Sequence, residues 1–187
     1  MGNRNREIES KWFSTLTMEE LRARLEAGMG KRLDDVVAAQ GIDTYWAISD
    51  SKFIRVRARE GTPQGACQMT VKSKDRESNQ NRVEIDVDCS SPTEQTIKLL
   101  TAAMGEPTGA LSKRYWVYWL RGADEHTNIS LYTIKGHDGT FVEFEASTKA
   151  KLEEIESKYL PYLGSIVAKP KSLYELFILP KKERFVL

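Results

Sequence analysis

The sequence predicts an α+β protein built on a closed, eight-stranded antiparallel β-barrel, with a charged lumen and helices packed outside. Three observations favour this fold. Eight stretches alternate polar and apolar residues with a period of two, which is the pattern of β-strands. Short turns join most of these stretches, as expected of antiparallel neighbours. The polar face is densely charged in strand after strand, and about eight strands can close around a small ligand.

The size and composition are those of an ordinary globular protein. The chain has 187 residues, of which 40% are hydrophobic and 29% are charged. This length favours a single domain over residues 1–187. The two cysteines are too few for a disulfide scaffold or a four-cysteine zinc site.

Charge and hydropathy exclude two classes of partner. The formal net charge is +1, which argues against a protein that coats nucleic acid through a bulk positive field. No apolar run approaches the roughly 18 residues of a membrane span, and the N-terminus lacks the apolar core of a signal peptide. We therefore expect a cytoplasmic protein without membrane contact.

The eight strands are expected in order along the chain. Their residues are 5–13, 44–49, 53–60, 66–74, 82–88, 111–121, 128–135 and 140–147. A first helix is expected between the first two strands, because Thr17 and Glu20 have the spacing of a capping box. Apolar residues recur at helical spacing from Leu21 to Val37, with Gly28 and Gly30 as a break between two helices.

Two more helices and a short one complete the predicted fold. The second helix begins at Ser91, where Pro92 suits the first helical turn, and Gly105 ends it. The third runs from about Thr148 to Leu160, and a short helix is expected over residues 172–178.

The charges on the polar face are sorted by sign. That face carries Glu7, Glu9 and Lys11; Arg55, Arg57 and Arg59; Lys72 and Lys74; Arg82, Glu84, Asp86 and Asp88; and Glu143 and Glu145. Like charges two residues apart on one face repel, so sheet stability does not favour the arrangement. Paired carboxylates suit hard divalent cations, and clustered Arg and Lys suit phosphate oxygens. A metal-bound polyphosphate needs both, although a solvated face with cross-strand ion pairs explains any single strand.

An ordered set of motifs carries a resemblance to a known family. The first motif is Glu7-Ile8-Glu9-Ser10-Lys11, an ExExK sequence near the N-terminus. In order there follow Asp43-Thr44-Tyr45, Arg55-Val56-Arg57, Thr70-Val71-Lys72, residues 81–86, residues 139–145 and residues 172–176. The set resembles the CYTH family, the triphosphate tunnel metalloenzymes. This family includes class IV adenylate cyclases, thiamine triphosphatases and inorganic triphosphatases.

The resemblance implies roles for individual residues. It implies phosphate contacts from Lys11, Arg55, Arg57, Lys72, Lys74, Lys113 and Arg114. It implies a Mg²⁺ or Mn²⁺ site at Glu7, Glu9, Glu143 and Glu145, and catalytic roles for Glu84, Asp86 and Lys11.

Two departures from the family pattern leave alternatives open. The family usually has a Lys-x-Arg pair where this chain has Ser112-Lys113-Arg114, so either Lys113 or Arg114 faces the lumen. The family commonly has an acidic residue after Leu131, where this chain has Tyr132.

The function implied by the resemblance is metal-dependent hydrolysis of an inorganic or organic triphosphate. A class IV-type adenylate cyclase, which makes cyclic AMP and pyrophosphate from ATP, is the main alternative. A non-catalytic polyphosphate- or nucleotide-binding module is the third. The expected partner is a small-molecule triphosphate. The sequence does not decide whether the protein forms a homodimer.

Overall fold

Two compact units make up the chain in a computed structural model, which describes residues 4–30, 36–60, 66–74, 81–120, 127–169 and 171–182. The first unit consists of Met1–Arg6, Gln40–Lys113 and Lys171–Leu187, and the second of Glu7–Ala39 and Arg114–Pro170. Strands β1 (Arg4–Ser14), β2 (Val36–Ala47) and β6 (Gly109–Trp119) run through both units.

Within the described residues, the strands form an antiparallel sheet of nine strands. The remaining strands are β3 (Lys52–Arg59), β4 (Ala66–Lys74), β5 (Asn81–Pro92), β7 (Asn128–Ile134), β8 (Thr140–Ala146) and β9 (Val167–Ala168). Within the first unit the order is β5-β4-β3-β2-β6, and within the second it is β6-β7-β8-β1-β9.

The predicted α+β class and antiparallel sheet are confirmed, and the predicted closed eight-stranded barrel is not. The sheet has nine strands in an open order from β5 to β9, with an additional pairing between β5 and β1. The two-residue strand β9 was missed because it is too short to show alternation.

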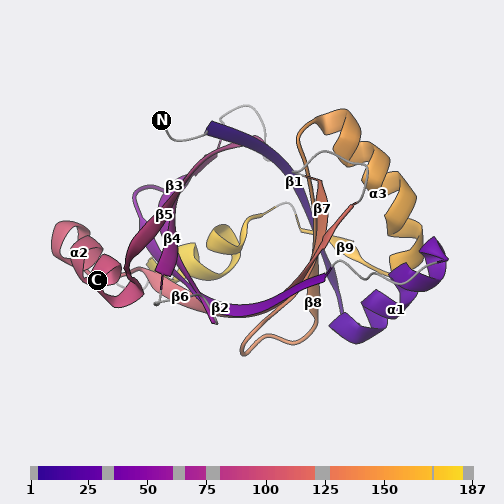
Figure 1. Ribbon diagram of the computed structural model, residues 1–187, viewed down its shortest axis with the longest axis horizontal. Helices are drawn as coiled ribbons and strands as arrows, with labels where there is room; N and C mark the ends of the chain where they lie inside the picture. Colours follow the sequence, from indigo (N-terminus) through magenta and orange to yellow (C-terminus); the bar gives the residue numbers. More distant parts are fainter. Residues whose placement is uncertain are drawn as a thin grey trace. The chain divides into compact units, whose positions relative to one another are not determined.

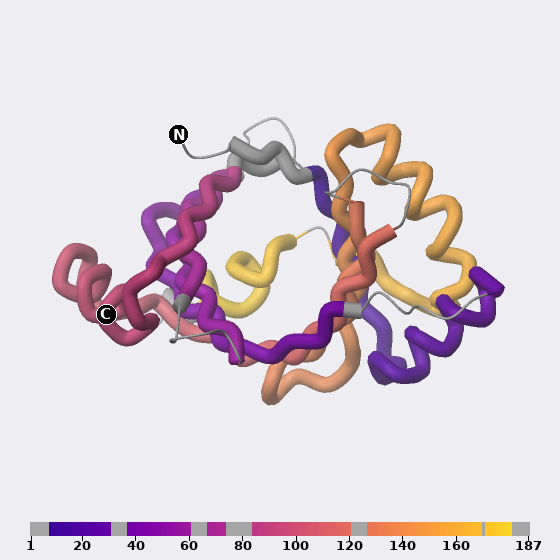
Figure 2. The backbone as a smooth tube through the Cα atoms, in the orientation of Figure 1, coloured from indigo at the N-terminus to yellow at the C-terminus, as the bar shows by residue number. Residues whose placement is uncertain are grey.

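The second unit buries one face of its sheet under α1 (Met18–Met29) and α3 (Lys149–Leu163). These two helices are far apart in the sequence and lie side by side, next to β7 and β8 (Figures 1 and 2). Their apolar side chains, including Leu21, Leu25 and Leu152, pack against Ile129, Val142 and Phe144 of the strands.

The first predicted helix and the break after it are confirmed, and the second helix predicted beyond the break is wrong at its end. Helix α1 begins at the capping box of Thr17 and Glu20, as predicted, and ends at Met29. Gly30 follows with a left-handed backbone (φ 63), which favours glycine and stops the helix. Val36 and Val37, expected at the end of the second helix, instead begin β2. Both are β-branched, and such residues pack well on a pleated surface.

The first unit has a smaller apolar layer on one face of its sheet. Helix α2 (Thr93–Met104) places Ile97 and Leu100 against Trp46, Val56 and Cys67. The described part of the chain ends in a short helical segment, η2 (Tyr174–Ile178) and α4 (Leu179–Lys182), where a short helix was predicted. None of the helices described is long and apolar enough to cross a membrane.

Replacing Phe144 by Ala is expected to lower the free energy of unfolding by about 3–5 kcal/mol, because the change empties a space in the core. Phe144 is fully buried in β8, between the acidic residues Glu143 and Glu145. Urea denaturation measures this loss. Leu99→Ala is the control, since Leu99 is 69% exposed on α2 and its loss should stay within about 0.5 kcal/mol. Equal losses in the two variants would contradict the core described above.

Candidate functional site

The first unit carries a group of buried cations on the face of its sheet opposite α2. We call Arg55, Arg57, Lys72 and Lys113, with their acidic partners Asp43 and Glu84, the cationic cluster. Alternation places them there, because Ile54 and Val56 point toward α2 and the odd-numbered residues of β3 point away. Arg55, Lys72, Lys113, Asp43 and Glu84 are all at most 9% exposed.

Asp43 is the acidic centre of one half of this cluster. Its carboxylate accepts hydrogen bonds from Arg57 Nε at 2.8 Å and Arg57 Nη2 at 3.0 Å, one to each oxygen. Lys113 Nζ lies 2.6 Å from Asp43 Oδ2. The Asp43–Arg57 pair is held in register, since the two residues are directly opposite on β2 and β3. Asp43 therefore fixes the positions of two cations.

Burial and neighbouring charges act against each other in this group. Burial tends to raise the pKa of Asp43, but the charges of Arg57 and Lys113 outweigh it and hold that pKa well below its usual value. Burial lowers the pKa of Lys113 to about 8, with Arg57 and Arg55 acting in the same direction and Asp43 opposing them. The charge of Lys113 is therefore sensitive to mildly alkaline pH.

Glu84 is the acidic centre of the other half. It lies 3.3 Å from Arg55 Nη2 through Oε1 and 2.6 Å from Lys72 Nζ through Oε2. Thr70 accepts a hydrogen bond from Arg55 Nη2 at 2.9 Å and donates one to Asp86 at 2.6 Å. The register of β4 and β5 pairs Lys72 with Glu84 and Thr70 with Asp86. These contacts make Glu84 a counter-ion of two predicted phosphate ligands.

Three buried aromatic rings lie on the same face of the first unit. Phe53 and Tyr174 stack with their centroids 4.5 Å apart, and Tyr45 lies 5.5 Å from Phe53. The Tyr174 hydroxyl donates to the Ser49 carbonyl oxygen at 2.9 Å, which ties η2 to the turn before β3. These contacts give the three rings a role in packing.

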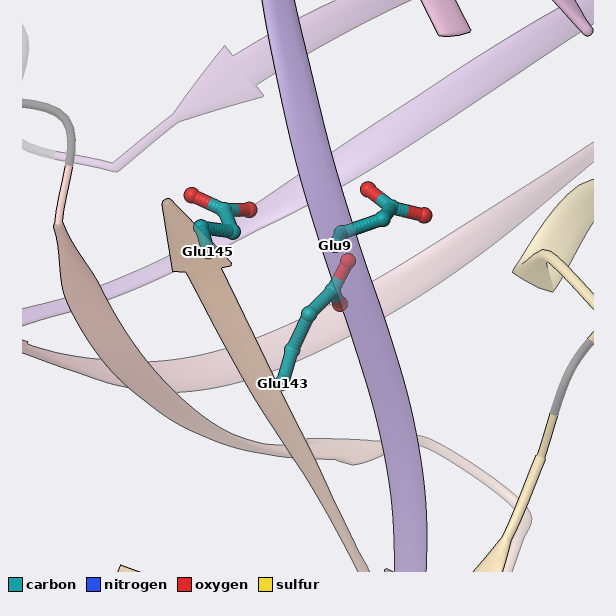
Figure 3. Close-up of side chains that lie close together, drawn as sticks. All are labelled: Glu9, Glu143 and Glu145. Atoms are coloured by element: carbon teal, nitrogen blue, oxygen red, sulfur yellow. The ribbon is translucent and has the colours of Figure 1, made fainter. Parts of the chain in front are cut away.

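The second unit holds an acidic triad on the face of its sheet opposite α1 and α3. The triad consists of Glu9 from β1 and Glu143 and Glu145 from β8 (Figure 3). One carboxylate oxygen from each residue lies within 4.8 Å of one from each of the others. Glu9 is directly opposite Glu145 in the strand register, and Lys11 is opposite Glu143. The pairing of β1 with β8 thus brings the two acidic motifs together.

Three polar side chains hold the triad in place. Lys11 Nζ lies 3.5 Å from Glu9 Oε1 and 3.3 Å from Glu143 Oε1. The Tyr132 hydroxyl donates to Glu143 at 2.9 Å, and the Asn128 amide donates to Glu145 at 2.8 Å. Carboxylate oxygens held this close together suit a hard divalent cation.

The structure shows which of Lys113 and Arg114 lies on the same face as the cationic cluster. Lys113 is buried with Asp43, whereas Arg114 is exposed on the opposite face of β6 and pairs with Glu19 of α1. Arg114 also lies over the Trp116 ring, with its guanidinium carbon 5.5 Å from the ring centroid. The side chains of Glu7 and Lys74, both predicted site residues, lie outside the described residues.

Several residues of the two clusters had no predicted role. Asp43 and Thr70 were both part of predicted motifs, but neither had a function assigned to it. Tyr132 was noted only as a departure from the family pattern, yet it bonds directly to Glu143. Asn128 lies at the start of β7, and only the pairing of β7 with β8 reveals its contact with Glu145.

Comparison with solved structures identifies the fold. The PH1012 protein from Pyrococcus horikoshii OT3 is similar with a TM-score of 0.71 and 23% identity, over 91% of this chain and 98% of that one. HpAC1 from Hippeastrum, a candidate adenylyl cyclase described as having a dominant triphosphatase activity, is similar with a TM-score of 0.62. It is 14% identical, over 97% of each chain. A candidate adenylate cyclase, bh2851 from Bacillus halodurans, is similar with a TM-score of 0.59 and 16% identity, over 95% of this chain and 99% of that one.

Comparison of the sequence alone finds no related protein. No protein-family model matches the chain, and no curated protein matches it. The similar structures include proteins described as adenylate cyclases or as having triphosphatase activity. The resemblance to the triphosphate tunnel metalloenzymes is therefore confirmed at the level of the fold.

Proposed function

We propose that this chain is a CYTH-family enzyme that hydrolyses a small triphosphate with the help of Mg²⁺ or Mn²⁺. The observation that carries the proposal is the presence, on charged sheet faces of one chain, of an acidic triad and a buried cationic cluster. The acidic triad has the chemistry that a divalent cation requires, and the cationic cluster has the chemistry that phosphate oxygens require. A single domain over residues 1–187 and a cytoplasmic location are proposed together with this function.

The cationic cluster is proposed to bind the phosphate oxygens. Arg55, Arg57, Lys72 and Lys113 bring four positive charges together, and Asp43 and Glu84 hold them in place. Arg57, whose guanidinium Asp43 holds through Nε and Nη2, is proposed to contact phosphate as well. The buried Arg55 Nε has no hydrogen-bond partner among the described residues, and a ligand oxygen would supply one after a small adjustment. Lys11, Lys74 and Arg114 remain proposals for phosphate contacts, with Arg114 the weakest because of its pairing with Glu19.

The acidic triad fits a hard divalent cation. Its donors are all carboxylate oxygens, which Mg²⁺ and Mn²⁺ prefer. Glu9, Glu143 and Glu145 would hold the ion, with Glu7 proposed as a further ligand. A bound cation of this kind neutralises the charge that develops on phosphate oxygens during transfer.

Phosphoryl transfer asks the protein chiefly for positioning and charge stabilisation. Lys11 is proposed to orient Glu9 and Glu143 and to contact the substrate, since its ammonium lies between them. Asp86 is proposed to position the attacking water, because its contact with Thr70 holds the carboxylate in place. Glu84 is proposed to act with Asp86, and its contacts with Arg55 and Lys72 also make it a counter-ion.

Product analysis tests the proposed reaction against its alternatives. The protein is incubated with tripolyphosphate, ATP or thiamine triphosphate and either Mg²⁺ or Mn²⁺. Release of orthophosphate that requires the metal supports the proposal. Formation of cyclic AMP and pyrophosphate from ATP would favour the cyclase. Two of the similar structures are described as candidate cyclases. Tight binding without turnover of any of the three would favour a binding module.

A further inference from the structure

The two cysteines of the chain lie directly opposite each other on neighbouring strands. Cys67 on β4 is the register partner of Cys89 on β5, next to an irregularity in the pairing between Ala66 and Cys67. Residues that are directly opposite point to the same face of an antiparallel sheet. Both thiols are free. They therefore form a facing dithiol.

The backbone geometry of such a pair suits a disulfide. Directly opposite residues of antiparallel strands have Cα atoms about 4.5 Å or 5.5 Å apart. Both values lie within the range of about 4.4–6.8 Å found across disulfides. The bond would thus form without separating or shifting the strands by a residue.

The surroundings of the two thiols show how an oxidant would reach them. Cys67 is 6% exposed and contacts the apolar layer under α2, where its thiol donates to Thr96 Oγ1 at 3.5 Å. Cys89 is partly exposed, and its thiol donates to the Val87 carbonyl oxygen at 3.7 Å. Cys89 is therefore the more accessible of the two thiols to a small oxidant, and Cys67 is the buried one.

We propose that Cys67 and Cys89 are a redox modification site, in which a peroxide converts the two thiols to an intramolecular disulfide. The Cys89 thiolate attacks one peroxide oxygen, the O–O bond breaks, and Cys89 becomes a sulfenic acid with release of water. The Cys67 sulfur then attacks the Cys89 sulfur, the S–O bond breaks, and a second water leaves. The two thiols lose two hydrogens and two electrons, which reduce one hydrogen peroxide to two waters. The proposal does not depend on the proposed triphosphatase activity.

Thiol counting and intact mass test this site directly, because the chain contains only two cysteines. The native protein is treated with hydrogen peroxide, the peroxide is removed, and thiols are counted after unfolding. The thiol count is expected to fall from two to zero per chain, with a monomeric species, full recovery with a dithiol reductant and a loss of two hydrogens from the peptides that carry Cys67 and Cys89. Peptide mapping is needed because peroxide also adds oxygen to methionine, of which the chain has five. Oxygen atoms added to either cysteine, a disulfide-linked dimer or two surviving thiols would each overturn the proposal.

Cys67→Ser and Cys89→Ser are the matched controls. Each retains one thiol and is expected to gain oxygen atoms or form a dimer under the treatment that gives the wild-type protein its internal bond. A mass loss of two hydrogens in either variant would show that the assignment is wrong.

A second measurement needs no variant. The chain is equilibrated in glutathione buffers, once folded and once in guanidinium chloride. Because one oxidised glutathione yields two reduced ones, the midpoint is expressed as [GSH]²/[GSSG]. The folded chain is expected to be half oxidised at a value of [GSH]²/[GSSG] about tenfold higher than the unfolded chain, because the sheet holds the thiols together. An equal or lower value for the folded chain would mean that the sheet does not favour the bond.

Discussion

Glu145→Gln is expected to lower metal-dependent triphosphate turnover by about 100-fold or more, because it removes one carboxylate of the acidic triad. The substitution keeps the size of the side chain and an oxygen able to accept the 2.8 Å hydrogen bond from Asn128. Only the charge and one potential ligand are lost. Changes to residues that merely support metal ligands typically cost about 10–100-fold, so loss of a ligand should exceed that range. Glu9→Gln should have the same effect.

Stability measured without metal distinguishes this explanation from simple unfolding. Three carboxylates lie within 4.8 Å of one another with Lys11 as their cationic neighbour, so neutralising one relieves repulsion. The metal-free Glu145→Gln protein should therefore have a melting temperature equal to or above that of the wild-type protein. The rise in melting temperature that Mn²⁺ gives the wild-type protein should be lost. A variant that still gains stability from Mn²⁺ and turns over at the wild-type rate would place the metal elsewhere.

Two matched variants complete the comparison. Glu153→Gln removes an exposed carboxylate on α3 that pairs with Lys149, and it should change neither turnover nor metal binding. Tyr132→Phe removes the hydroxyl that donates to Glu143, and it should weaken metal binding by about 10–100-fold while a higher Mn²⁺ concentration restores turnover. Failure of added Mn²⁺ to restore the Tyr132→Phe protein would argue against a supporting role.

Strand alternation was enough to predict which residues share the charged faces. Glu143 and Glu145 alternate with Val142 and Phe144, and the structure buries both apolar residues under the helices. The same rule decides between Lys113 and Arg114 once the register of β6 is known, because neighbours in a strand point to opposite faces. The sequence alone could not decide, since Ser112 breaks the expected pattern and leaves both registers plausible.

Partners across strands were beyond the reach of sequence periodicity. The hydrogen bond from Tyr132 to Glu143 depends on how β7 pairs with β8, and period-two patterns carry no information on pairing. Val36 and Val37 were misplaced for a related reason, because an apolar pair fits both a helix face and a strand. The left-handed backbone at Gly30 ends α1, and Val36 and Val37 belong to β2.

Asp43→Asn is expected to lower the free energy of unfolding by about 3–5 kcal/mol, because it removes the shared counter-ion of the buried Lys113 and the partly buried Arg57. Asp43 is 1% exposed and contacts Arg57 through both oxygens and Lys113 at 2.6 Å. Urea denaturation at neutral pH measures the loss. Glu60→Gln, which alters an exposed carboxylate of the same unit, should leave stability unchanged.

The pH dependence of ligand binding separates the electrostatic role of Asp43 from its structural one. In the wild-type protein, burial lowers the pKa of Lys113 to about 8, while Asp43 keeps it from falling further. Binding of tripolyphosphate that depends on the Lys113 charge is therefore present below about pH 8 and weakens as the pH rises through that value. Without the Asp43 charge the pKa of Lys113 falls, since burial and the neighbouring arginines act unopposed. The loss of binding at alkaline pH, which we call the alkaline limb, should then move to lower pH by about one unit.

Calorimetric titration with tripolyphosphate between about pH 6 and 9, where lysines of lowered pKa titrate, measures this limb. Lys113→Met supplies the reference, because it removes the titrating group and should flatten the limb in both backgrounds. Arg57→Lys keeps the positive charge but loses the two-pronged contact with Asp43, so it should weaken binding without moving the limb. If Asp43→Asn instead lowers affinity equally at every pH, then Asp43 acts on the ligand through the position of Arg57 alone, and the charge of Lys113 does not depend on it.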